Sequence, residues 1–256
     1  MDERQTFIIE YLQAHGFATA DELAEVLKVS PITVRREFSR LEQGGFIKRV
    51  HGGAMPPDHT LATTHISFRL RQNETAKREI AQYAVRLIQP HDIVFLDAGS
   101  TCMFVTEYLP DNLDVTIITH ALDNMNVLRK KSRVKLIAIG GEFNETLGAF
   151  VGPTAEIHLE QLSADKAFLG AAGLNPSRGC VNNSLTETKI KRQMNSQSRE
   201  PYILADSSKF GKDALHNTIP VSDMRNIITD TSAPPDQVDA FIAVGVKVEI
   251  APKEQA

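Results

Sequence analysis

A segment early in the chain gathers hydroxyl and guanidinium side chains on one predicted helix. Arginine pairs with guanine edges and with phosphates, and hydroxyl groups bond to bases or to the duplex backbone. A helix that presents such groups suits the major groove of DNA, where residues near its N-terminus reach the bases. We expect bases to be read by Thr33, Arg35 and Arg36. Arg40 lies farther along the same helix, and Ser30 is expected to hold a phosphate.

The neighbouring elements favour this interpretation. Ser30 can cap a helix, and Pro31 suits the first turn. An apolar stripe follows at helical spacing: Val34, Phe38 and Leu41. Taken alone, this pattern favours an ordinary amphipathic helix with a solvated charged face, because such helices are common. However, Thr19 opens another short helix, and only residues 28–30 separate the two, which is the spacing of a helix-turn-helix.

A β-prone run with basic side chains follows the second helix, which ends at Gly44 and Gly45. The run at 46–53 has the pattern of a wing, a small hairpin that lies along a phosphate backbone. We expect phosphates to be held by Lys48, Arg49 and His51. The window from 28 to 51 holds six Lys or Arg against two acidic residues, although the whole chain has a net charge of −4. The positive charge is therefore local, as a one-sided DNA-binding surface requires.

The composition is that of a globular protein with sizeable cores: 256 residues, 42% hydrophobic and 23% charged. Residues 1–55 are predicted to form a winged helix-turn-helix, 56–64 a linker, and 65–256 an α/β domain. No segment is apolar enough to span a membrane and none resembles a signal peptide, so a cytoplasmic protein is expected. The two cysteines and eight histidines lack metal-ligand spacing, and neither a metal site nor a cofactor is expected.

Short apolar runs alternate with helical segments beyond Pro90, which predicts a mainly parallel sheet covered on both faces. A long helix that ends near Gln89 precedes them. Strands are predicted at 93–96, 115–118, 134–139, 167–169, 202–205, 227–229 and 246–250. Helices are predicted at 101–109, 122–130, 154–161, 185–197 and 237–244. In such a sheet the ligand site lies at the carboxyl ends of the strands.

Small and polar residues follow several of these strands. Gly99 allows close approach of the backbone, and hydroxyls beside the free N–H groups of a helix start suit a phosphate, although such turns are also common helix caps. Lysine pairs with phosphate, and carboxylates accept bonds from sugar hydroxyls. The candidate residues are Asp97, Gly99, Ser100, Thr101, Thr119, Gly141, Glu187, Lys189, Asp206 and Lys209. A small phosphorylated polyol is the expected ligand, and His120 at a strand end is interpreted as structural.

Together these motifs resemble the DeoR-type bacterial transcription regulators over almost the whole chain. In the N-terminal part the resemblance rests on Val29-Ser30, Thr33-Val34-Arg35-Arg36 and His51-Gly52-Gly53-Ala54. In the C-terminal part it rests on Asp97-x-Gly99-Ser100-Thr101, Gly140-Gly141, Asp206-Ser207-Ser208-Lys209-Phe210-Gly211 and Ile228-Thr229-Asp230. Where the family commonly has Thr-Asn-Ser after the second strand, this chain has Thr119-His120-Ala121.

The resemblance implies a winged helix-turn-helix joined to a sensor domain related to ribose-5-phosphate isomerase. Members of the family usually repress sugar-catabolic operons and release double-stranded operator DNA when a phosphorylated intermediate binds. The segments 185–189 and 205–209 are similar to parts of the isomerase, which implies that Glu187, Lys189 and Lys209 belong to the pocket.

A DNA-binding repressor without enzymatic activity is the favoured interpretation. A homodimer or homotetramer is expected, because a single winged domain binds DNA weakly. The alternative is a sugar-phosphate isomerase or deaminase with a regulatory domain, which leaves the base-reading helix unexplained. Activation instead of repression is a further alternative, because the sign depends on where the operator lies relative to the promoter.

Overall fold

The chain divides into two compact units, Met1–Phe68 and Arg69–Ala256. The computed structural model describes residues 2–15, 17–50, 52–56 and 66–253. Of the predicted linker at 56–64, all but the first residue lies outside the described residues. Each unit has a hydrophobic core of its own.

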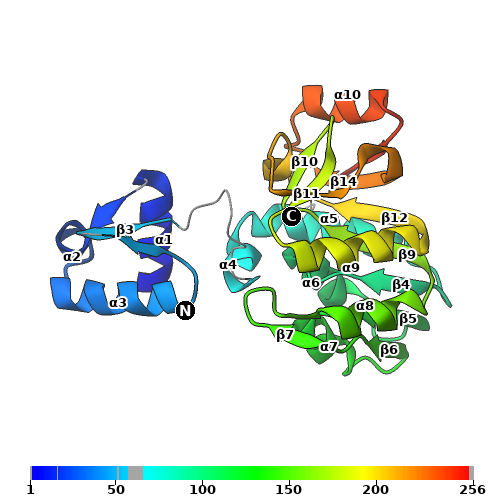
Figure 1. Ribbon diagram of the computed structural model, residues 1–256, viewed down its shortest axis with the longest axis horizontal. Coiled ribbons are helices and arrows are strands. Elements are labelled where there is room, and N and C mark those ends of the chain that lie inside the picture. Colours follow the sequence, from blue (N-terminus) through cyan, green and yellow to red (C-terminus); the bar gives the residue numbers. More distant parts are fainter. Residues whose placement is uncertain (1, 16, 51, 57–65, 254–256) are drawn as a thin grey trace. The chain divides into compact units, whose positions relative to one another are not determined.

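The first unit packs helices against a small antiparallel sheet in the order β1-β3-β2 (Figure 1). Its described helices are α1 (Glu3–His15), α2 (Ala20–Leu27) and α3 (Pro31–Gln43). Its described strands are β1 (Ala18–Thr19), β2 (Lys48–Val50) and β3 (Gly53–Met55). The helix-turn-helix is formed by α2 and α3, and the wing by β2 and β3, as the sequence predicts.

Local hydrogen bonds determine where α2 and α3 begin. Thr19 and Glu22 form a capping box, with backbone N–H groups donating to the Thr19 hydroxyl at 3.1 Å and to the Glu22 carboxylate at 2.8 Å. Lys28 ends α2 in the left-handed conformation. Ser30 then accepts a bond of 3.2 Å from the Thr33 N–H and so caps α3. The core beneath includes Ile8, Leu12, Leu23, Val34, Phe38 and Leu41.

The second unit is built on a seven-stranded sheet in the order β15-β14-β12-β9-β4-β5-β6. Its strands are β4 (Ile93–Leu96), β5 (Val115–Thr119), β6 (Val134–Ala138), β9 (Ala164–Gly170), β12 (Ser198–Leu204), β14 (Asn226–Asp230) and β15 (Lys247–Ala251). Every neighbouring pair in this sheet is parallel. These are the strands that the sequence predicts, so the mainly parallel α/β fold is confirmed.

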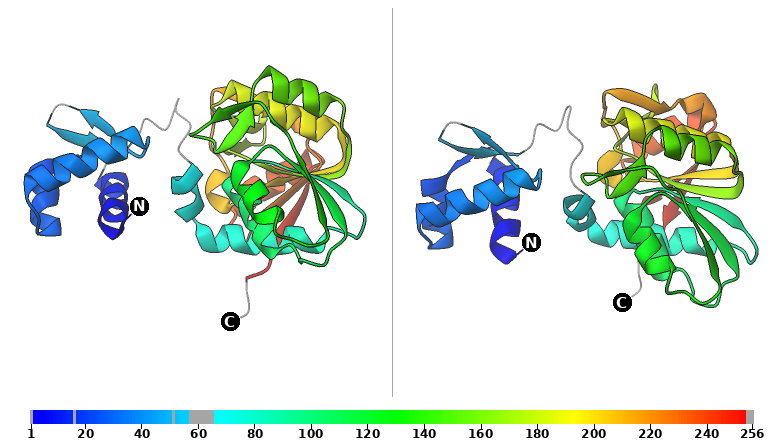
Figure 2. Two further views of the ribbon diagram at one scale, coloured as in Figure 1. Left: turned by 90° about the horizontal axis from the view of Figure 1, so that it is seen from below. Right: turned by 60° about the horizontal axis from the view of Figure 1, so that its bottom comes forward.

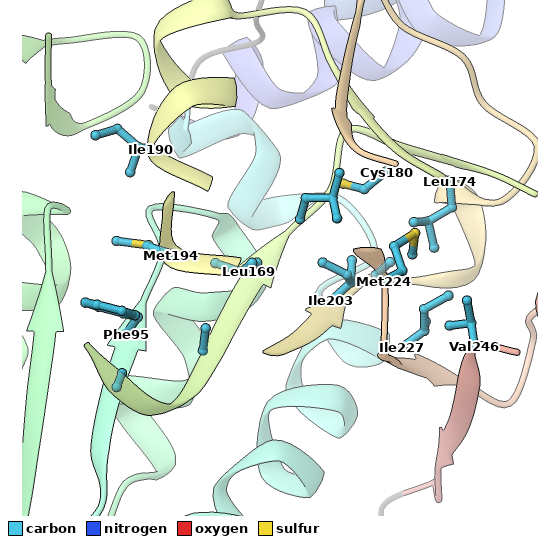
Figure 3. Packing of buried hydrophobic residues seen from close by; sticks show 14 of the residues in the cluster. Phe95, Leu169, Leu174, Cys180, Ile190, Met194, Ile203, Met224, Ile227 and Val246 are labelled. Atoms are coloured by element: carbon cyan, nitrogen blue, oxygen red, sulfur yellow. The ribbon is translucent and has the colours of Figure 1, made fainter. Parts of the chain in front are cut away.

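Helices cover both faces of this sheet (Figures 1 and 2). One core contains residues of α5 (Glu74–Arg86), α6 (Ser100–Tyr108) and α7 (Leu122–Leu128). The other contains residues of α8 (Pro153–Glu160), α9 (Leu185–Ser196) and α10 (Pro235–Ala243), and Figure 3 shows part of it. Alternation along β4 separates the two cores, since Val94 and Leu96 lie in the first and Phe95 in the second.

The long helix predicted to end near Gln89 is two helices, α4 (Ile66–Arg71) and α5. The break lies at Asn73, whose φ of 50° is left-handed. The ammonium of the buried Lys77 donates to the backbone carbonyls of Arg69 and Gln72 at the end of α4. These bonds stabilise the break, which no glycine or proline marks in the sequence.

Several short antiparallel strands were not predicted. The hairpin of β7 (Glu142–Asn144) and β8 (Ala149–Val151) is one case. The sheet of β10 (Gly173–Asn175), β11 (Gly179–Asn182) and β13 (His216–Ile219) is the other. Runs of this length are too short to show an apolar period. Over the described part of the chain, no helix is long and apolar enough to cross a membrane.

Candidate functional site

The predicted DNA-contacting residues of α3 lie close to its exposed side and differ in how they are held. The hydroxyls of Ser30 and Thr33 bond to each other at 2.9 Å. Arg40 pairs with the buried carboxylate of Glu37 at 3.1 Å. Arg36 is exposed, and so is Arg35. The surface therefore offers arginines on a helix that its own cap and core hold in place.

The wing is joined to α3 by Arg49. Its backbone N–H donates to the Glu42 carboxylate at 3.0 Å, and its guanidinium donates to the Ser39 hydroxyl at 2.9 Å. Lys48 on the same strand is exposed, whereas His51 lies outside the described residues. The structure thus brings Lys48 and Arg49 beside α3, in one basic surface with the arginines of that helix.

In the second unit, the order of the strands locates a topological switch point. The chain passes from β4 through β5 to β6 in one direction, and later strands continue from β9 in the other. The adjacent pair β4 and β9 is therefore the switch point, and ligands of open α/β sheets bind beside the carboxyl ends at such a point. The predicted residues at 97–101 follow β4 directly.

Four buried side chains meet there, which we call the Asp97 cluster: Asp97, His120, Glu187 and Lys191. The Lys191 ammonium donates to Asp97 and lies 3.1 Å from Glu187 Oε1. The Gly170 N–H, at the end of β9, donates to Asp97 Oδ2 at 2.8 Å. His120 Nε2 lies 3.3 Å from Asp97 Oδ1, and its Nδ1 donates to the Phe150 carbonyl of β8 at 2.9 Å. The cluster joins the ends of β4, β5 and β9 to α9.

Pairing dominates the electrostatics of this cluster. Burial by itself raises the pKa of Asp97, but the Lys191 ammonium and the His120 ring hold it well below its usual range. Burial likewise lowers the pKa of Lys191, and the carboxylates of Asp97 and Glu187 raise it above the usual value. Asp97 and Lys191 are therefore an ion pair at neutral pH.

The structure does not bring the predicted Lys189 to this cluster. Its side chain is 51% exposed and pairs with Glu156 on α8 at 3.3 Å. Lys191 occupies the place expected for Lys189, because it lies four residues after Glu187 and so shares its helix face, whereas Lys189 lies only two residues after it. The signal was present in the sequence as this i, i+4 pair.

The glycine-hydroxyl loop follows the carboxyl end of β4, as predicted, and the strand order puts it at the switch point. Ser100 and Thr101 are buried in the first turn of α6, near its free N–H groups. A Cβ placed on Gly99 would lie 3.1 Å from the Cα of Gly170, so the loops after β4 and β9 touch through their backbones. This close approach, and not only helix capping, requires the small residue.

Thr119 and Gly141 lie at the carboxyl ends of β5 and β6, where each has a packing role. The Thr119 hydroxyl accepts from Asn124 Nδ2 at 3.2 Å, and Asn124 also donates to the Asp97 carbonyl at 3.0 Å. Gly141 has a φ of 149°, and a Cβ there would lie 2.6 Å from the Val151 carbonyl of β8. Sequence reasoning missed Asn124, which is buried and links these strand ends.

A second group of charges, the Asp206 cluster, follows β12: Arg69, Lys77, Asp206 and Lys209. Asp206 Oδ1 accepts from Asn73 Nδ2 at 2.9 Å and from the Ser208 N–H at 3.1 Å. The loop after β12 is thereby bonded to the break between α4 and α5. Since β9 alone separates β12 from β4, the two clusters lie at strand ends about 10 Å apart.

Cations are concentrated in the Asp206 cluster. Burial lowers the pKa of Lys77 to about 8, against the attraction of Asp206 and with repulsion from Lys209 and Arg69. Burial also lowers the pKa of Lys209, and Asp206 opposes this shift. A bound anion would relieve the repulsion among these three cations. The pattern could have been found in the sequence only for Lys209, because Lys77 looks like a surface residue of a helix.

Some buried polar atoms in the two clusters have no hydrogen-bond partner among the described residues. They include Glu187 Oε2 and Asp206 Oδ2, and these residues are only 3% and 1% exposed. Nε and Nη2 of Arg69 are also unpartnered. A carboxylate oxygen accepts a bond from a hydroxyl, and a guanidinium donates to a phosphate. The site therefore has acceptors for a polyol and donors for a phosphate.

The chemistry of metals and thiols is not evident at this site. Within the described residues, no group of His, Cys, Asp and Glu could hold a metal ion. Cys102 in α6 is buried, which raises the pKa of its thiol, and its Sγ donates to the Phe168 carbonyl at 3.4 Å. It is a packed core residue.

Comparison with known proteins identifies both units. A family model described as DeoR-like helix-turn-helix domain matches residues 4–60, and one described as DeoR C terminal sensor domain matches residues 72–231. The chain is 36% identical over 220 residues to the HTH-type transcriptional regulator IolR of Bacillus subtilis, covering 86% of this chain and 87% of that protein. It is 32% identical over 234 residues to the L-fucose operon activator of Haemophilus influenzae, covering 91% and 94%.

Among solved structures, the chain is similar to a ribose 5-phosphate isomerase from Methanocaldococcus jannaschii. The sequence identity is 20% and the TM-score 0.41, over 54% of this chain and 55% of the isomerase.

Proposed function

Because the chain belongs to the DeoR family of transcription regulators, we propose that it represses a sugar-catabolic operon and leaves its operator when a phosphorylated sugar binds. In this proposal α3 and the wing of β2 and β3 contact double-stranded DNA in the cytoplasm. The second unit senses the sugar at the switch point of its sheet.

The observation that carries the sensing function is the pair of buried carboxylate oxygens without donors, Glu187 Oε2 and Asp206 Oδ2. An unpaired buried acceptor costs about 1–3 kcal/mol, which a sugar hydroxyl would recover by donating to it. The cations of the Asp206 cluster supply the complementary charge for a phosphate. A polyol that carries a phosphate matches both requirements.

Thermal unfolding of the purified protein tests this proposal. The panel pairs sugar phosphates with the same sugars lacking the phosphate. A ligand at 100 times its Kd stabilises the folded state by about 2.7 kcal/mol, which a melting curve resolves. We expect stabilisation by a phosphorylated sugar and none by its unphosphorylated partner. Equal effects of the two would count against the phosphate site.

DNA release is tested with duplexes that the protein itself enriches from a random library. Fluorescence anisotropy measures binding with and without the stabilising sugar phosphate, and we expect the ligand to raise the Kd for DNA. Transcription from a promoter with the enriched sequence then distinguishes repression from activation, the role named for the H. influenzae relative.

The proposal includes a homodimer or homotetramer, since paired winged domains reach paired half-sites. Light scattering on the free protein and on its complex with the enriched duplex measures the number of chains. A single chain bound to one half-site would contradict it.

Isomerase activity is the competing function, because a buried carboxylate such as Glu187 could serve as a base. We favour binding without turnover, since Glu187 Oε1 is held at Lys191 and Lys191 is held at Asp97. Conversion of aldose phosphates to ketose phosphates by the purified protein, abolished in Glu187→Gln, would overturn this choice.

A further inference from the structure

Helix α3, which is proposed to contact the bases, carries a large apolar side chain that is exposed to solvent. Ile32 is 75% exposed, the highest value among the exposed large hydrophobic residues in the described part of the chain. It lies in the first turn of α3, between Pro31 and Thr33. Neither the core nor the cap of the helix uses this side chain, since the cap is formed by Ser30 and the core begins with Val34.

Helix geometry places Ile32 opposite the core. Residues of an α-helix are about 100° apart, so the stripe of Val34, Phe38 and Leu41 faces inward and the line of Ile32, Arg36 and Ser39 faces outward. Ser39 is the residue that the wing contacts through Arg49. The outward line therefore runs from Ile32 at the N-terminus of the helix, past Arg36, to the wing.

The surroundings of Ile32 are basic and polar, which argues against a buried protein partner and for DNA. Arg36 lies one turn away on the same line, and Arg35 is also exposed. The nearby hydroxyls of Ser30 and Thr33 are bonded to each other at 2.9 Å. Residues in the first turn of a recognition helix are those that reach base edges.

The major groove presents one apolar group, the C5-methyl of thymine, among its donors and acceptors. An isoleucine on a base-facing line has no hydrogen bond to offer, and contact with that methyl is the favourable use of its surface. We infer that Ile32 reads a thymine methyl in each half-site bound by a winged domain. This inference rests on the proposed DNA-binding function and assigns one base of the operator to one residue.

The test replaces thymine by deoxyuridine, which pairs identically but lacks the methyl. The full-length protein selects duplexes from a random library, and each thymine of the enriched sequence is then replaced singly. At one position in each half-site, we expect the Kd of the wild-type protein to rise about fourfold, the factor for about 0.8 kcal/mol per buried methylene-sized group.

Ile32→Ala completes the cycle. We expect this variant to bind the thymine duplex about fourfold more weakly, and to bind the thymine and deoxyuridine duplexes equally at that position. Ile157→Ala is the matched control, because Ile157 is an exposed isoleucine (58%) on α8 of the other unit. The preference of this variant for the thymine duplex over the deoxyuridine duplex should equal that of the wild type. Melting curves verify that both variants are folded.

The outcomes separate this inference from the function on which it rests. Failure to enrich any duplex would contradict DNA binding itself. Enrichment with the same deoxyuridine effects in the wild type and in Ile32→Ala would leave DNA binding intact and overturn the reading of thymine by Ile32. A uniform loss of affinity in Ile32→Ala on both duplexes would instead assign the residue to the sugar-phosphate backbone, and would also overturn it.

Discussion

The exposed Arg35 of α3 and the charged residues of the Asp97 cluster are held in opposite ways. Arg35 lies 3.9 Å from Asp21, with side chains 59% and 70% exposed, whereas Lys191 and Asp97 are 2% and 0% exposed. An exposed pair contributes about 0–1 kcal/mol, but removing one partner of a buried pair costs about 3–5 kcal/mol. Arg35 can therefore exchange its partner for DNA, whereas the charges of the cluster hold the strand ends in place.

Loss of Lys191 should give the largest effect. Lys191→Met leaves the carboxylates of Asp97 and Glu187 buried without their cation, and we expect the free energy of unfolding to fall by about 3–5 kcal/mol. Denaturant unfolding measures it. Lys189→Met is the matched control, because Lys189 is on the same helix and half exposed, and its effect should stay within about 0.5 kcal/mol. Similar losses in both variants would remove the contrast.

Lowering the pH should reduce the stabilisation that the Asp97 cluster provides, by less than Lys191→Met does. In the folded state the pKa of Asp97 lies below its ordinary value of about 3.9, so the unfolded chain binds more protons as the pH falls through that value. The stabilisation is complete at neutral pH and is lost below about pH 4. The effect is smaller because protonated Asp97 still leaves Glu187 beside Lys191.

Unfolding free energies between pH 7 and pH 3 measure this dependence. Asp97→Asn has no carboxyl group to titrate at that position, and its stability should fall less steeply below pH 4. Equal pH dependence of the unfolding free energy in the wild type and in Asp97→Asn would contradict the assignment of this effect to Asp97.

The Asp206 cluster should decide affinity for phosphate and not stability. Lys209→Gln removes one cation of the three near Asp206, and a bond between charged groups is worth about 1.5–3 kcal/mol. We expect the Kd for the sugar phosphate to rise at least about tenfold, with DNA binding in its absence unchanged. Lys212→Gln, an exposed lysine three residues farther on, is the control. Isothermal calorimetry measures the Kd for the sugar phosphate in both variants. An equal loss of affinity in the two would show that the lysine charge acts only at long range.

On α3, Arg36→Ala should reduce operator discrimination by about 1–3 kcal/mol for the base contact it removes. Competition between the enriched duplex and variants with single base changes measures it. We expect the variant to tolerate one base change that the wild type rejects, while its melting temperature is unchanged because Arg36 is exposed. Unaltered preference at every position would show that Arg36 contacts phosphate alone.

The hydrophobic periodicity of the sequence was enough to predict the large strands and helices. It failed where the backbone conformation depends on single side chains. All seven parallel strands were predictable because each contains apolar residues bounded by polar loops; the edge strands β6 and β15 are only partly buried. The break between α4 and α5 was not, because it depends on the side chain of Lys77 and on Asn73 in a left-handed conformation. Neither leaves an interruption in the helical pattern.

At the candidate site, too, the general position was predictable from the sequence and the choice of individual side chains was not. Its position at the carboxyl ends followed from the predicted parallel sheet, and Asp97, Glu187 and Asp206 lie there. Choosing Lys191 instead of Lys189 required knowing which side of α9 faces the sheet. Arg69 and Lys77 were missed because Asp206 and Lys209, the other members of their cluster, lie more than a hundred residues away along the chain, and only the fold brings them together.

The contact between Gly99 and Gly170 limits how this sensor can diverge. A Cβ on either glycine would lie 3.1 or 3.2 Å from the other's Cα, so the main chain would have to shift with any substitution. These two loops are distant in sequence, but a substitution at one glycine therefore requires a matching backbone shift in the other loop. The segment 119–121 and the β7–β8 hairpin are not part of this backbone contact, so they can change in sequence without moving it.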